Sequence, residues 1–375
     1  MKLKLNFKNI FTMKKNKRTN IWLLVCVALL VVIGFIFVYS ASMYSAELNY
    51  GDKFYFLKKQ IIGALVGTVA LILMANIDYN ILSKYKIPIM IISLVLLALV
   101  FIPGLGVANY GARRWIRMPG FTIQPSEIAK FGFVIFSASY LAKNKDIVGT
   151  FKGILPVLIA GGTTCALIIL EPNMSITICV GLVMFLMLFV GGAKIKHFLV
   201  LAVPVIAAGV LLVVIEPYRM ERLMAFINPW ANPQGEGYQL IQSLYSLSAG
   251  GLFGVGIFNS RQKYLFLPFS ESDFIFSIIG EELGFAGCML IMLIFAFLIY
   301  LGIKIAMQAP NRFGSYLATG IVSVIGAQVL INIAVVSGSI PPTGVPLPFI
   351  SAGSTALVVF MASIGILLNI DRQSH

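Results

Sequence analysis

The sequence predicts an all-α polytopic membrane protein with about ten transmembrane helices. Of its 375 residues, 59% are hydrophobic and only 11% are charged, and the mean hydropathy is +0.94. A soluble domain is typically about 45–50% apolar and about 25% charged. This chain could not fold in water without exposing large apolar surfaces, so its solvent must be a lipid bilayer.

Ten apolar segments approach the roughly 20 residues that a membrane-spanning helix needs. The predicted spans are residues 21–42, 57–77, 85–103, 126–142, 153–170, 174–191, 197–215, 274–300, 313–337 and 349–370. A basic tail, residues 1–20, precedes the transmembrane domain of residues 21–370, and residues 371–375 follow it. No small-residue cleavage site comes after the first span, so we expect an uncleaved anchor.

The Lys and Arg residues predict the orientation. With the N-terminus inside, seventeen of the 28 fall in cytoplasmic segments, ten fall in outer segments, and Lys130 falls inside a span. Cytoplasmic loops carry the excess of positive charge, so we predict that both termini lie inside. The net charge of +14 is then explained by the membrane topology and by contact with anionic lipid. We expect no nucleic-acid partner.

Few residues are available for metal or disulfide chemistry. The four cysteines lie in apolar runs without CxxC spacing, and the two histidines, His197 and His375, are far apart in the sequence. Neither a disulfide framework nor a zinc site is indicated by this pattern. A Ser-His-Asp triad is equally disfavoured.

Two basic clusters fall on the outer side, against the insertion preference. They are Arg113, Arg114 and Arg117 in one loop, and Arg261 and Lys263 in another. Basic side chains retained there favour an anionic ligand such as a phosphate group. Contact with outer-leaflet headgroups is the alternative explanation.

The outer loop of residues 217–273, between the seventh and eighth spans, is unusually long. A loop of this length in a compact protein is usually functional. Its Gly-rich centre, residues 238–256, is predicted to form an interfacial helix or a re-entrant segment.

Residues 337–357, SGSIPPTGVPLPFISAGSTAL, separate the ninth and tenth spans. Four prolines exclude a regular helix, and irregular backbone at membrane depth is tolerated only where it packs on protein or lines a cavity. We therefore predict a re-entrant loop that offers the hydroxyl groups of Thr343, Ser351 and Ser354.

Carboxylates gather at the start of the eighth span, in LPFSESDFIFSIIGEELGFAG. Asp273 falls at the outer N-terminus of this helix, where it could cap the helix or project into a cavity. Glu281 and Glu282 lie within the span, and turning a carboxylate toward lipid would cost at least ~2.5 kcal/mol. We expect both to face protein or water, either as structural hydrogen-bond partners or as part of a site.

The fourth span carries Glu127 and Lys130, which share a helix face. A lysine inside a span is rare unless it is paired or faces a polar cavity. A buried ion pair and a contact to a substrate phosphate explain it equally well. At the outer end of the fifth span, Glu171 and Asn173 lie on the same side of the membrane.

Several strings together resemble one known family. They are VYSAS (38–42), GARRWI (111–116), QPSE (124–127), NPWANPQGEGYQLIQS (228–243), GGLFGVG (250–256), NSRQK (259–263), SDFIFSIIGEELG (272–284) and PPTGVPLPFISAGSTAL (341–357). In this order they are similar to the SEDS family (shape, elongation, division, sporulation), which comprises the FtsW, RodA and SpoVE peptidoglycan polymerases. NSRQK and the PW of NPWANPQG resemble FtsW and SpoVE more than RodA.

The resemblance implies a glycosyltransferase that polymerises lipid II outside the bacterial cytoplasmic membrane and releases undecaprenyl pyrophosphate. It implies that Asp273 is the catalytic residue, that a class B penicillin-binding protein is a partner, and that division-complex proteins join it at the septum. An α-linked donor and a β-1,4 product require inversion, hence one displacement and one general base. A divalent cation, Mg²⁺ or Mn²⁺, would suit the pyrophosphate.

The candidate substrate-binding residues share an outer-face position or a polar group buried in a span. They are Arg113, Arg114, Lys130, Arg261, Lys263, Glu127, Glu281, Thr343, Ser351 and Ser354. A lipid II flippase and a non-catalytic scaffold for the penicillin-binding protein are the competing functions. Within the family, elongation and sporulation are the alternatives to a role in division.

Two strings depart from the family pattern. LPFSESDF stands where members commonly read LPEAHTDF, so Phe269 replaces an acidic residue and Glu271 appears two positions later. EPNMSI stands where many members have a QPDLGT-like string, which puts a polar role for Asn173 in doubt.

Overall fold

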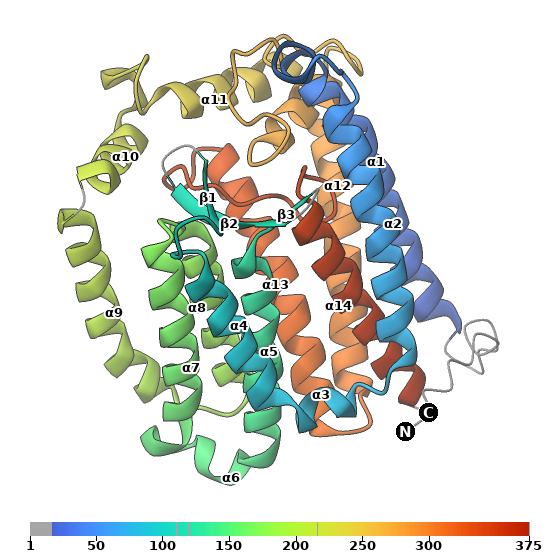
Figure 1. Cartoon of the computed structure of the whole chain (residues 1–375), viewed down its shortest axis with the longest axis vertical. Helices are drawn as coiled ribbons and strands as arrows, with labels where there is room; N and C mark the ends of the chain where they lie inside the picture. Colours follow the sequence, from blue (N-terminus) through green and yellow to red (C-terminus); the bar gives the residue numbers. More distant parts are fainter. Residues whose placement is uncertain (1–16, 110–111, 119–120, 216, 375) are drawn as a thin grey trace.

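The computed structural model describes residues 17–109, 112–118, 121–215 and 217–374. Within these residues each of the ten predicted spans coincides with a helix, and the helices stand side by side as a bundle (Figure 1). They are α1 (Lys17–Tyr50), α2 (Tyr55–Asn76), α4 (Lys86–Leu99), α5 (Pro125–Lys143), α7 (Phe151–Leu170), α8 (Met174–Val190), α9 (Ile195–Ile215), α12 (Ile275–Gln308), α13 (Arg312–Val336) and α14 (Ser354–Gln373). Among the described residues, seven of these helices are long and apolar enough to cross a membrane, whereas α4 and α8 are shorter apolar helices. The chain is therefore a multi-span membrane protein, as predicted.

The shorter helices lie at the two ends of the bundle. The lower end in Figure 1 carries α3 (Asn80–Lys84) and α6 (Lys145–Val148). The upper end carries α10 (Pro217–Ile227), the 3₁₀ turn η2 (Pro229–Ala231) and α11 (Tyr238–Gly250). The start of α1 and the end of α14 lie at the same lower end (Figure 1), and which side of the membrane they occupy stays a prediction.

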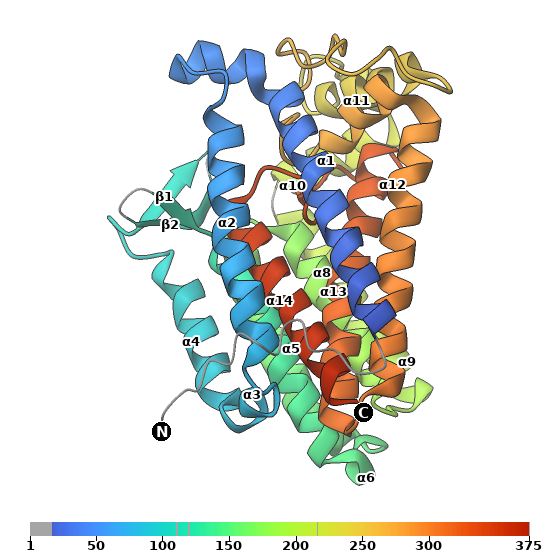
Figure 2. The same cartoon turned by 90° about the vertical axis from the view of Figure 1, so that its right-hand side faces the viewer.

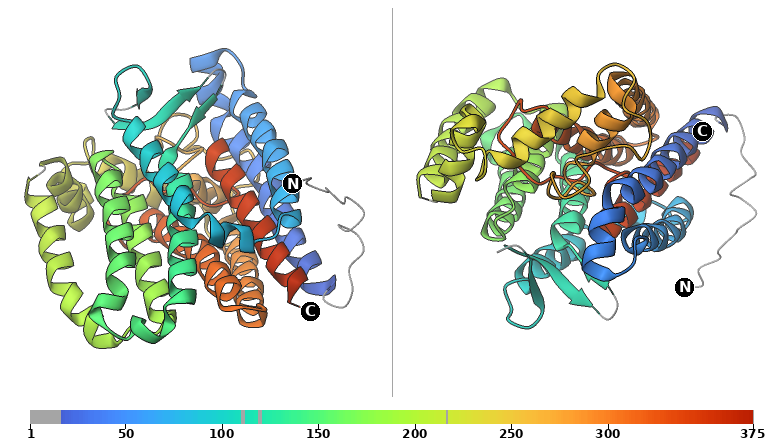
Figure 3. Two further views of the ribbon diagram at one scale, coloured as in Figure 1. Left: turned by 60° about the horizontal axis from the view of Figure 1, so that its bottom comes forward. Right: turned by 90° about the horizontal axis from the view of Figure 1, so that it is seen from above.

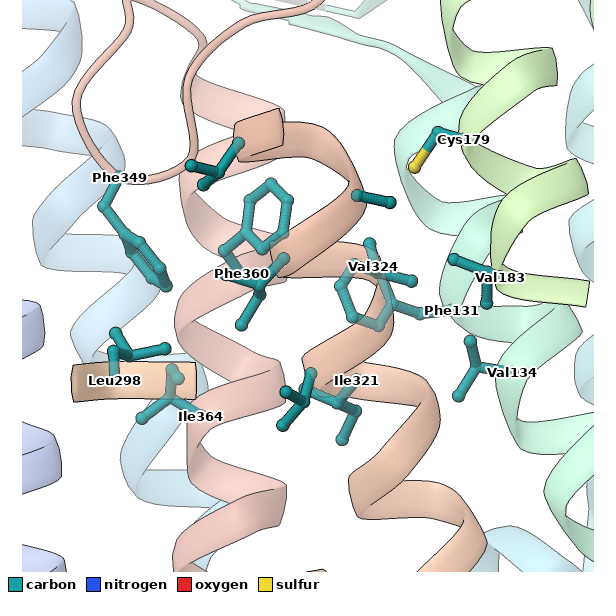
Figure 4. Close-up of a cluster of buried hydrophobic side chains, with 14 of the residues drawn as sticks. Phe131, Val134, Cys179, Val183, Leu298, Ile321, Val324, Phe349, Phe360 and Ile364 are labelled. Atoms are coloured by element: carbon teal, nitrogen blue, oxygen red, sulfur yellow. The ribbon is translucent and has the colours of Figure 1, made fainter. Parts of the chain in front are cut away.

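Helix α13 is the centre of the packing, because it contacts α12, α5, α8 and α14. Side chains from these helices form one buried apolar cluster (Figure 4). Phe131 and Val134 come from α5, Val183 from α8, Ile321 and Val324 from α13, and Phe360 and Ile364 from α14. Helix α9, by contrast, stands at the rim of the bundle (Figure 3), with α10 above it in Figure 1, and its apolar side chains are largely exposed.

Glycines allow α2 and α14 to pack closely. A Cβ atom added at Gly365 would lie 2.3 Å from the carbonyl oxygen of Leu71, and one at Gly67 would lie 2.6 Å from the sulfur of Met361. Small residues at such contacts let helix backbones approach each other, which is how membrane helices gain packing energy.

A small antiparallel sheet, which the sequence analysis did not predict, joins α4 to α5. Its strands are β1 (Gly106–Asn109), β2 (Ala112–Met118) and β3 (Phe121–Ile123), in the order β1-β2-β3. Ile116 pairs with Ile123, and Figure 2 shows the sheet at one edge of the bundle. Within a strand successive side chains point to opposite faces, so the neighbours Arg113 and Arg114 on β2 diverge.

Helix α12 is broken at Gly284, which has φ 67° and ψ −167°. The backbone of the Gly-rich segment fills the break: Phe285 N–H donates to the carbonyl oxygen of Gly251 at 2.9 Å, and Val255 N–H donates to that of Glu281 at 2.9 Å. The predicted single span of residues 274–300 is thus an interrupted helix that continues to Gln308. The polar groups at the break are satisfied by the neighbouring loop, as buried backbone groups require.

The Pro-rich segment is irregular from residue 337 to residue 353, and most of its second half is buried. The last helix begins at Ser354 instead of residue 349, because Phe349 adopts a left-handed φ of 65° that ends any helical path there. How deeply this loop enters the membrane stays a prediction.

Candidate active site

Asp273 lies in the turn that precedes α12, and its side chain is partly buried. The capping position of α12 is Phe274, and no side chain caps the helix, so the capping role considered for Asp273 does not hold. Burial raises the pKa of Asp273, Arg114 and Arg222 lower it and Glu271 raises it, and the net result is a pKa of about 6. A carboxylate in this state can accept a proton near neutral pH.

The Pro-rich loop lies against this carboxylate. A Cβ atom added at Gly344 would be 2.5 Å from Oδ2 of Asp273, so a larger residue there would force the carboxylate to shift. The neighbouring Thr343 has a buried hydroxyl with no hydrogen-bond partner among the described residues. It is the one predicted hydroxyl that is left without a partner in this part of the chain.

The other two predicted hydroxyls are used by the backbone. Ser351 Oγ donates to the carbonyl oxygen of Ser272 at 2.6 Å and accepts from the N–H of Leu347 at 2.7 Å. Ser354 Oγ donates to the carbonyl oxygen of Lys59 at 3.5 Å. The hydroxyl of Ser351 therefore fixes the loop beside Asp273 instead of facing a ligand.

Two arginines from separate elements act electrostatically on Asp273. Arg114 on β2 donates from Nε to the carbonyl oxygen of Glu171 at 3.2 Å and also to that of Pro172. Arg222 on α10 donates to the carbonyl oxygen of Pro342 at 3.0 Å. Both guanidinium groups favour the charged form of Asp273, and together they create a positive environment beside the carboxylate.

Arg222 was not among the predicted site residues. The sequence placed it on the outer side, but a single arginine in a long loop carries no signal that it folds back onto a residue 51 positions later in the chain. Arg113, the predicted neighbour of Arg114, is exposed and lies on the opposite face of β2.

Glu281 and Glu282 are buried, and both face protein. Glu281 accepts from Ser260 Oγ at 2.5 Å, from Arg261 N–H at 2.9 Å and from Ser246 Oγ at 3.2 Å. It thereby holds the loop of residues 260–262 on α12.

Glu282 forms a buried ion pair with Lys263, with 3.4 Å between Nζ and Oε1, and accepts from Ser40 Oγ at 2.6 Å. The structure therefore assigns structural partners to Glu281 and Lys263, which the sequence analysis had grouped with the substrate-binding candidates.

Arg261 keeps an exposed side chain at the same place. Together with Ala249, Val255, Asn259 and Glu281 it lines a hollow of about 410 Å³. Its position would allow contact with a solvent-side anion, but no described contact joins it to Asp273.

Lys130 is 1% exposed and is held inside the bundle. Its Nζ lies 2.8 Å from Oε2 of Glu127 and 2.5 Å from Oε1 of Gln328. Of the two explanations left open by the sequence, the structure shows the buried ion pair.

Glu171 lies between Arg114 and the start of α8, and it is completely buried. Burial raises its pKa to about 8, although Arg114 opposes the shift. Asn173 accepts from the N–H of Ile176 at 3.4 Å and caps α8. The departure at EPNMSI thus keeps a polar role for Asn173, which is a helix cap.

The described residues contain no group of three or more His, Cys, Asp or Glu side chains that could hold a metal ion. A cation here would need its remaining ligands from a bound molecule, as Mg²⁺ commonly does with phosphate groups. Within the described chain, the site is therefore one carboxylate with a raised pKa, two flanking guanidinium groups and a fixed irregular loop. That set can remove a proton and stabilise a developing negative charge.

Comparisons with known proteins identify relatives over nearly the whole chain. A family model described as "Cell cycle protein", named for FtsW, RodA and SpoVE, matches residues 20–375. The chain is 42% identical to "Stage V sporulation protein E" of Bacillus subtilis, over 96% of this chain and 99% of that protein. It is 39% identical to "Probable peptidoglycan glycosyltransferase FtsW" of Geobacter metallireducens, over 99% of each.

Two solved structures share the fold. A chain described under "Structural coordination of polymerization and crosslinking by a peptidoglycan synthase complex" superposes with a TM-score of 0.78 and 27% identity, over 94% of this chain and 97% of that one. The rod shape determining protein RodA of Thermus thermophilus superposes with a TM-score of 0.68 and 24% identity, over 94% and 96%.

The buried ion pair predicts a clear effect on stability. Replacing Lys130 with Met leaves the Glu127 carboxylate buried without its partner, and breaking a buried pair typically costs about 3–5 kcal/mol. We expect a lower unfolding temperature in detergent, with partial recovery in the double variant E127Q/K130M.

Lys58→Met is the matched control for this measurement. It removes a lysine from an ion pair of nearly the same length, 2.7 Å to Asp52 against 2.8 Å, whose side chains are 64% and 35% exposed. Exposed pairs contribute little, so we expect almost no change. Equal unfolding temperatures for Lys130→Met and Lys58→Met would contradict the structural role of the buried pair.

Proposed function

The chain belongs to the FtsW, RodA and SpoVE family of peptidoglycan glycosyltransferases, and we propose that it polymerises lipid II into β-1,4 glycan strands on the outer face of the bacterial cytoplasmic membrane. The observation that carries this proposal is the partly buried Asp273, whose pKa is raised to about 6 beside Arg114 and Arg222. One base and nearby cations are the groups that a single inverting displacement requires.

In the proposed reaction Asp273 is the general base. The 4-hydroxyl group of an incoming lipid II attacks the anomeric carbon of the growing strand, and Asp273 takes the proton of this hydroxyl. The new glycosidic bond forms as the bond from the anomeric carbon to the phosphate oxygen breaks, and undecaprenyl pyrophosphate leaves. Negative charge grows on the pyrophosphate in the transition state, where preorganised cations stabilise it most effectively.

Arg114 and Arg222 are the cations placed to do this, because both act on Asp273 electrostatically from separate elements. Arg261 and Arg113 have exposed side chains and would serve the more distant parts of the lipid headgroups. Lys130, Lys263, Glu127 and Glu281 are committed to buried partners, so we do not retain them as substrate contacts.

Two other functions for the same chain are a lipid II flippase and a non-catalytic scaffold. A flippase needs polar groups along a path through the membrane, whereas Lys130 donates to both Glu127 and Gln328 in the interior of the bundle. A scaffold would tolerate the loss of Asp273. Polymerisation by the solubilised protein, with no membrane to cross, separates the enzyme from both.

We further propose a role in septal synthesis during cell division, with a class B penicillin-binding protein that cross-links the new strands. The similarity to FtsW supports division, and the similarity to stage V sporulation protein E points to sporulation as the alternative. A fluorescent fusion is expected at the septum of growing cells. Even distribution along the sidewall would instead favour elongation.

Asp273→Asn is expected to lower polymerisation of purified lipid II in detergent by about 10²–10⁴-fold, which is the usual contribution of a general base. The control is Asp52→Asn, the same change at an exposed aspartate of the loop between α1 and α2, which should leave the rate unchanged. Polymerisation at the normal rate by a folded Asp273→Asn protein would exclude Asp273 as the base.

The pH dependence of polymerisation follows from the raised pKa. The base works only when deprotonated, so the rate should be full above pH 7 and fall as the pH drops through about 6. Arg114→Gln removes a charge that lowers the pKa of Asp273 and should move this midpoint upward. Glu271→Gln removes a charge that raises the pKa and should move it downward; a midpoint unaffected by either change would contradict the assignment.

A divalent cation, Mg²⁺ or Mn²⁺, would supply charge neutralisation at the pyrophosphate when bound. Its ligands would come from the substrate phosphates and water, because the described residues contain no group of three or more His, Cys, Asp or Glu side chains that could hold it. Excess EDTA is expected to abolish polymerisation, and added Mg²⁺ or Mn²⁺ should restore it. A rate that EDTA leaves unchanged would show that the arginines suffice.

A further inference from the structure

Helix α13 carries two buried amide side chains, Gln328 and Asn332, which are 0% and 1% exposed. They are four residues apart and therefore lie on one face of the helix. A buried amide is costly unless it is hydrogen-bonded, so their partners explain why an otherwise apolar helix holds them.

Asn332 joins two segments that are distant in the sequence. Its Nδ2 donates to the carbonyl oxygen of Asp273 at 2.8 Å and to that of Val345 at 2.7 Å. One amide group thus holds the backbone of the candidate base and the backbone of the Pro-rich loop at a fixed separation.

Gln328 extends this connection one turn further along α13. Its Nε2 donates to the carbonyl oxygen of Pro346 at 3.0 Å, and its Oε1 accepts from Lys130 at 2.5 Å. Because Lys130 also pairs with Glu127, the ion pair of α5 is linked through Gln328 to the Pro-rich loop.

The same loop holds the residues before Asp273 as well. Ala352 N–H donates to the carbonyl oxygen of Glu271 at 2.9 Å, and Ser351 Oγ donates to that of Ser272 at 2.6 Å. Three successive carbonyl groups, at residues 271, 272 and 273, are therefore each bonded to the Pro-rich loop or to the helix that supports it.

Gly344 connects these backbone bonds to the carboxylate of Asp273. It directly precedes Val345 and Pro346, the two loop residues whose carbonyl groups are bonded to α13. Because a Cβ atom at Gly344 would lie 2.5 Å from Oδ2 of Asp273, the loop forms a wall against one carboxylate oxygen. A shift of Val345 or Pro346 would move that wall.

We infer that Asn332 and Gln328 are positioning residues that fix Asp273 against the Pro-rich loop, and that Glu127 and Lys130 act on the reaction through Gln328 without touching the substrate. This inference rests on the proposed function, because it assumes that Asp273 is the base. On this inference, the ion pair of α5 supports the reacting carboxylate from within the bundle.

The test uses the full-length protein, purified in detergent, with lipid II as the substrate. Asn332→Leu and Gln328→Leu keep most of the side-chain volume and remove the hydrogen bonds. A misplacement of about 1 Å can cost about 10²-fold in rate, so we expect kcat to fall about 10–100-fold while KM stays within about twofold. Freed from its tether, Asp273 becomes better hydrated, so the acidic midpoint of the pH–rate profile should move below its normal value.

Asn369→Leu is the matched control. Asn369 on α14 is also a buried amide bonded to the backbone: it donates to the carbonyl oxygen of Ala75 at 2.8 Å and accepts from the N–H of Tyr79 at 3.1 Å, near the opposite end of the bundle. Its loss should affect the unfolding temperature as much as the loss of Asn332, but neither kcat of the folded protein nor the pH midpoint.

The outcomes separate the inference from the proposed function. An inactive wild-type protein, or a fully active Asp273→Asn, would overturn the proposed function itself. If the wild-type protein is active and Asp273→Asn is not, but Asn332→Leu and Gln328→Leu have the same kcat and pH midpoint as Asn369→Leu, the positioning role is wrong. A lower kcat with an unchanged pH midpoint would also overturn the positioning role, because a smaller fraction of folded enzyme produces the same pattern.

Ser351→Ala provides a second variant if Asn332→Leu does not fold. It removes a single hydroxyl group and with it the bond to the carbonyl oxygen of Ser272. The same fall in kcat with the same shift of the pH midpoint would support the positioning role, and wild-type values for both would overturn it.

Discussion

Hydrogen bonds from side chains of the helices to the backbone of irregular loops are the interaction on which the rest of this structure depends. Buried carbonyl and amide groups of a loop have no water to bond, so a buried irregular segment persists only where protein groups satisfy it. Asn332 and Gln328 do so for the Pro-rich loop, and Glu281 does so for the loop of residues 260–262. The site can be irregular because the bundle beneath it supplies these partners.

The charged groups of the chain divide into two kinds by the same principle. Glu127 with Lys130 and Glu282 with Lys263 are paired in the interior, where an unpaired charge would be prohibitively costly. Asp273 is only partly buried, and Arg114 and Arg222 act on its charge electrostatically. Structural charges are thus neutralised by close partners, whereas the proposed base keeps a pKa at which it can exchange a proton.

Glycines allow the close contacts of this arrangement. Gly344 leaves room for the Asp273 carboxylate, and Gly284 opens α12 so that the Gly-rich segment can enter. In both places the requirement is set by a neighbouring backbone or side chain that is far away in the sequence. Changes at such positions would alter the site without altering any group that performs the chemistry.

The sequence alone determined the membrane class, the ten helical segments, the family and the position of Asp273 at the start of a span. These follow from hydropathy and from local motifs, which depend on residues that are neighbours in the chain. The sheet of residues 106–123, the break at Gly284, Arg222 beside Asp273 and the bonds of Gln328 and Asn332 were decided only by the tertiary structure. Two amides four residues apart in α13 were a readable signal of buried polar contacts, but their partners, such as the carbonyl oxygen of Asp273, lie 59 residues away. A local pattern shows that a buried polar group needs a partner, and only the folded chain decides which group meets it.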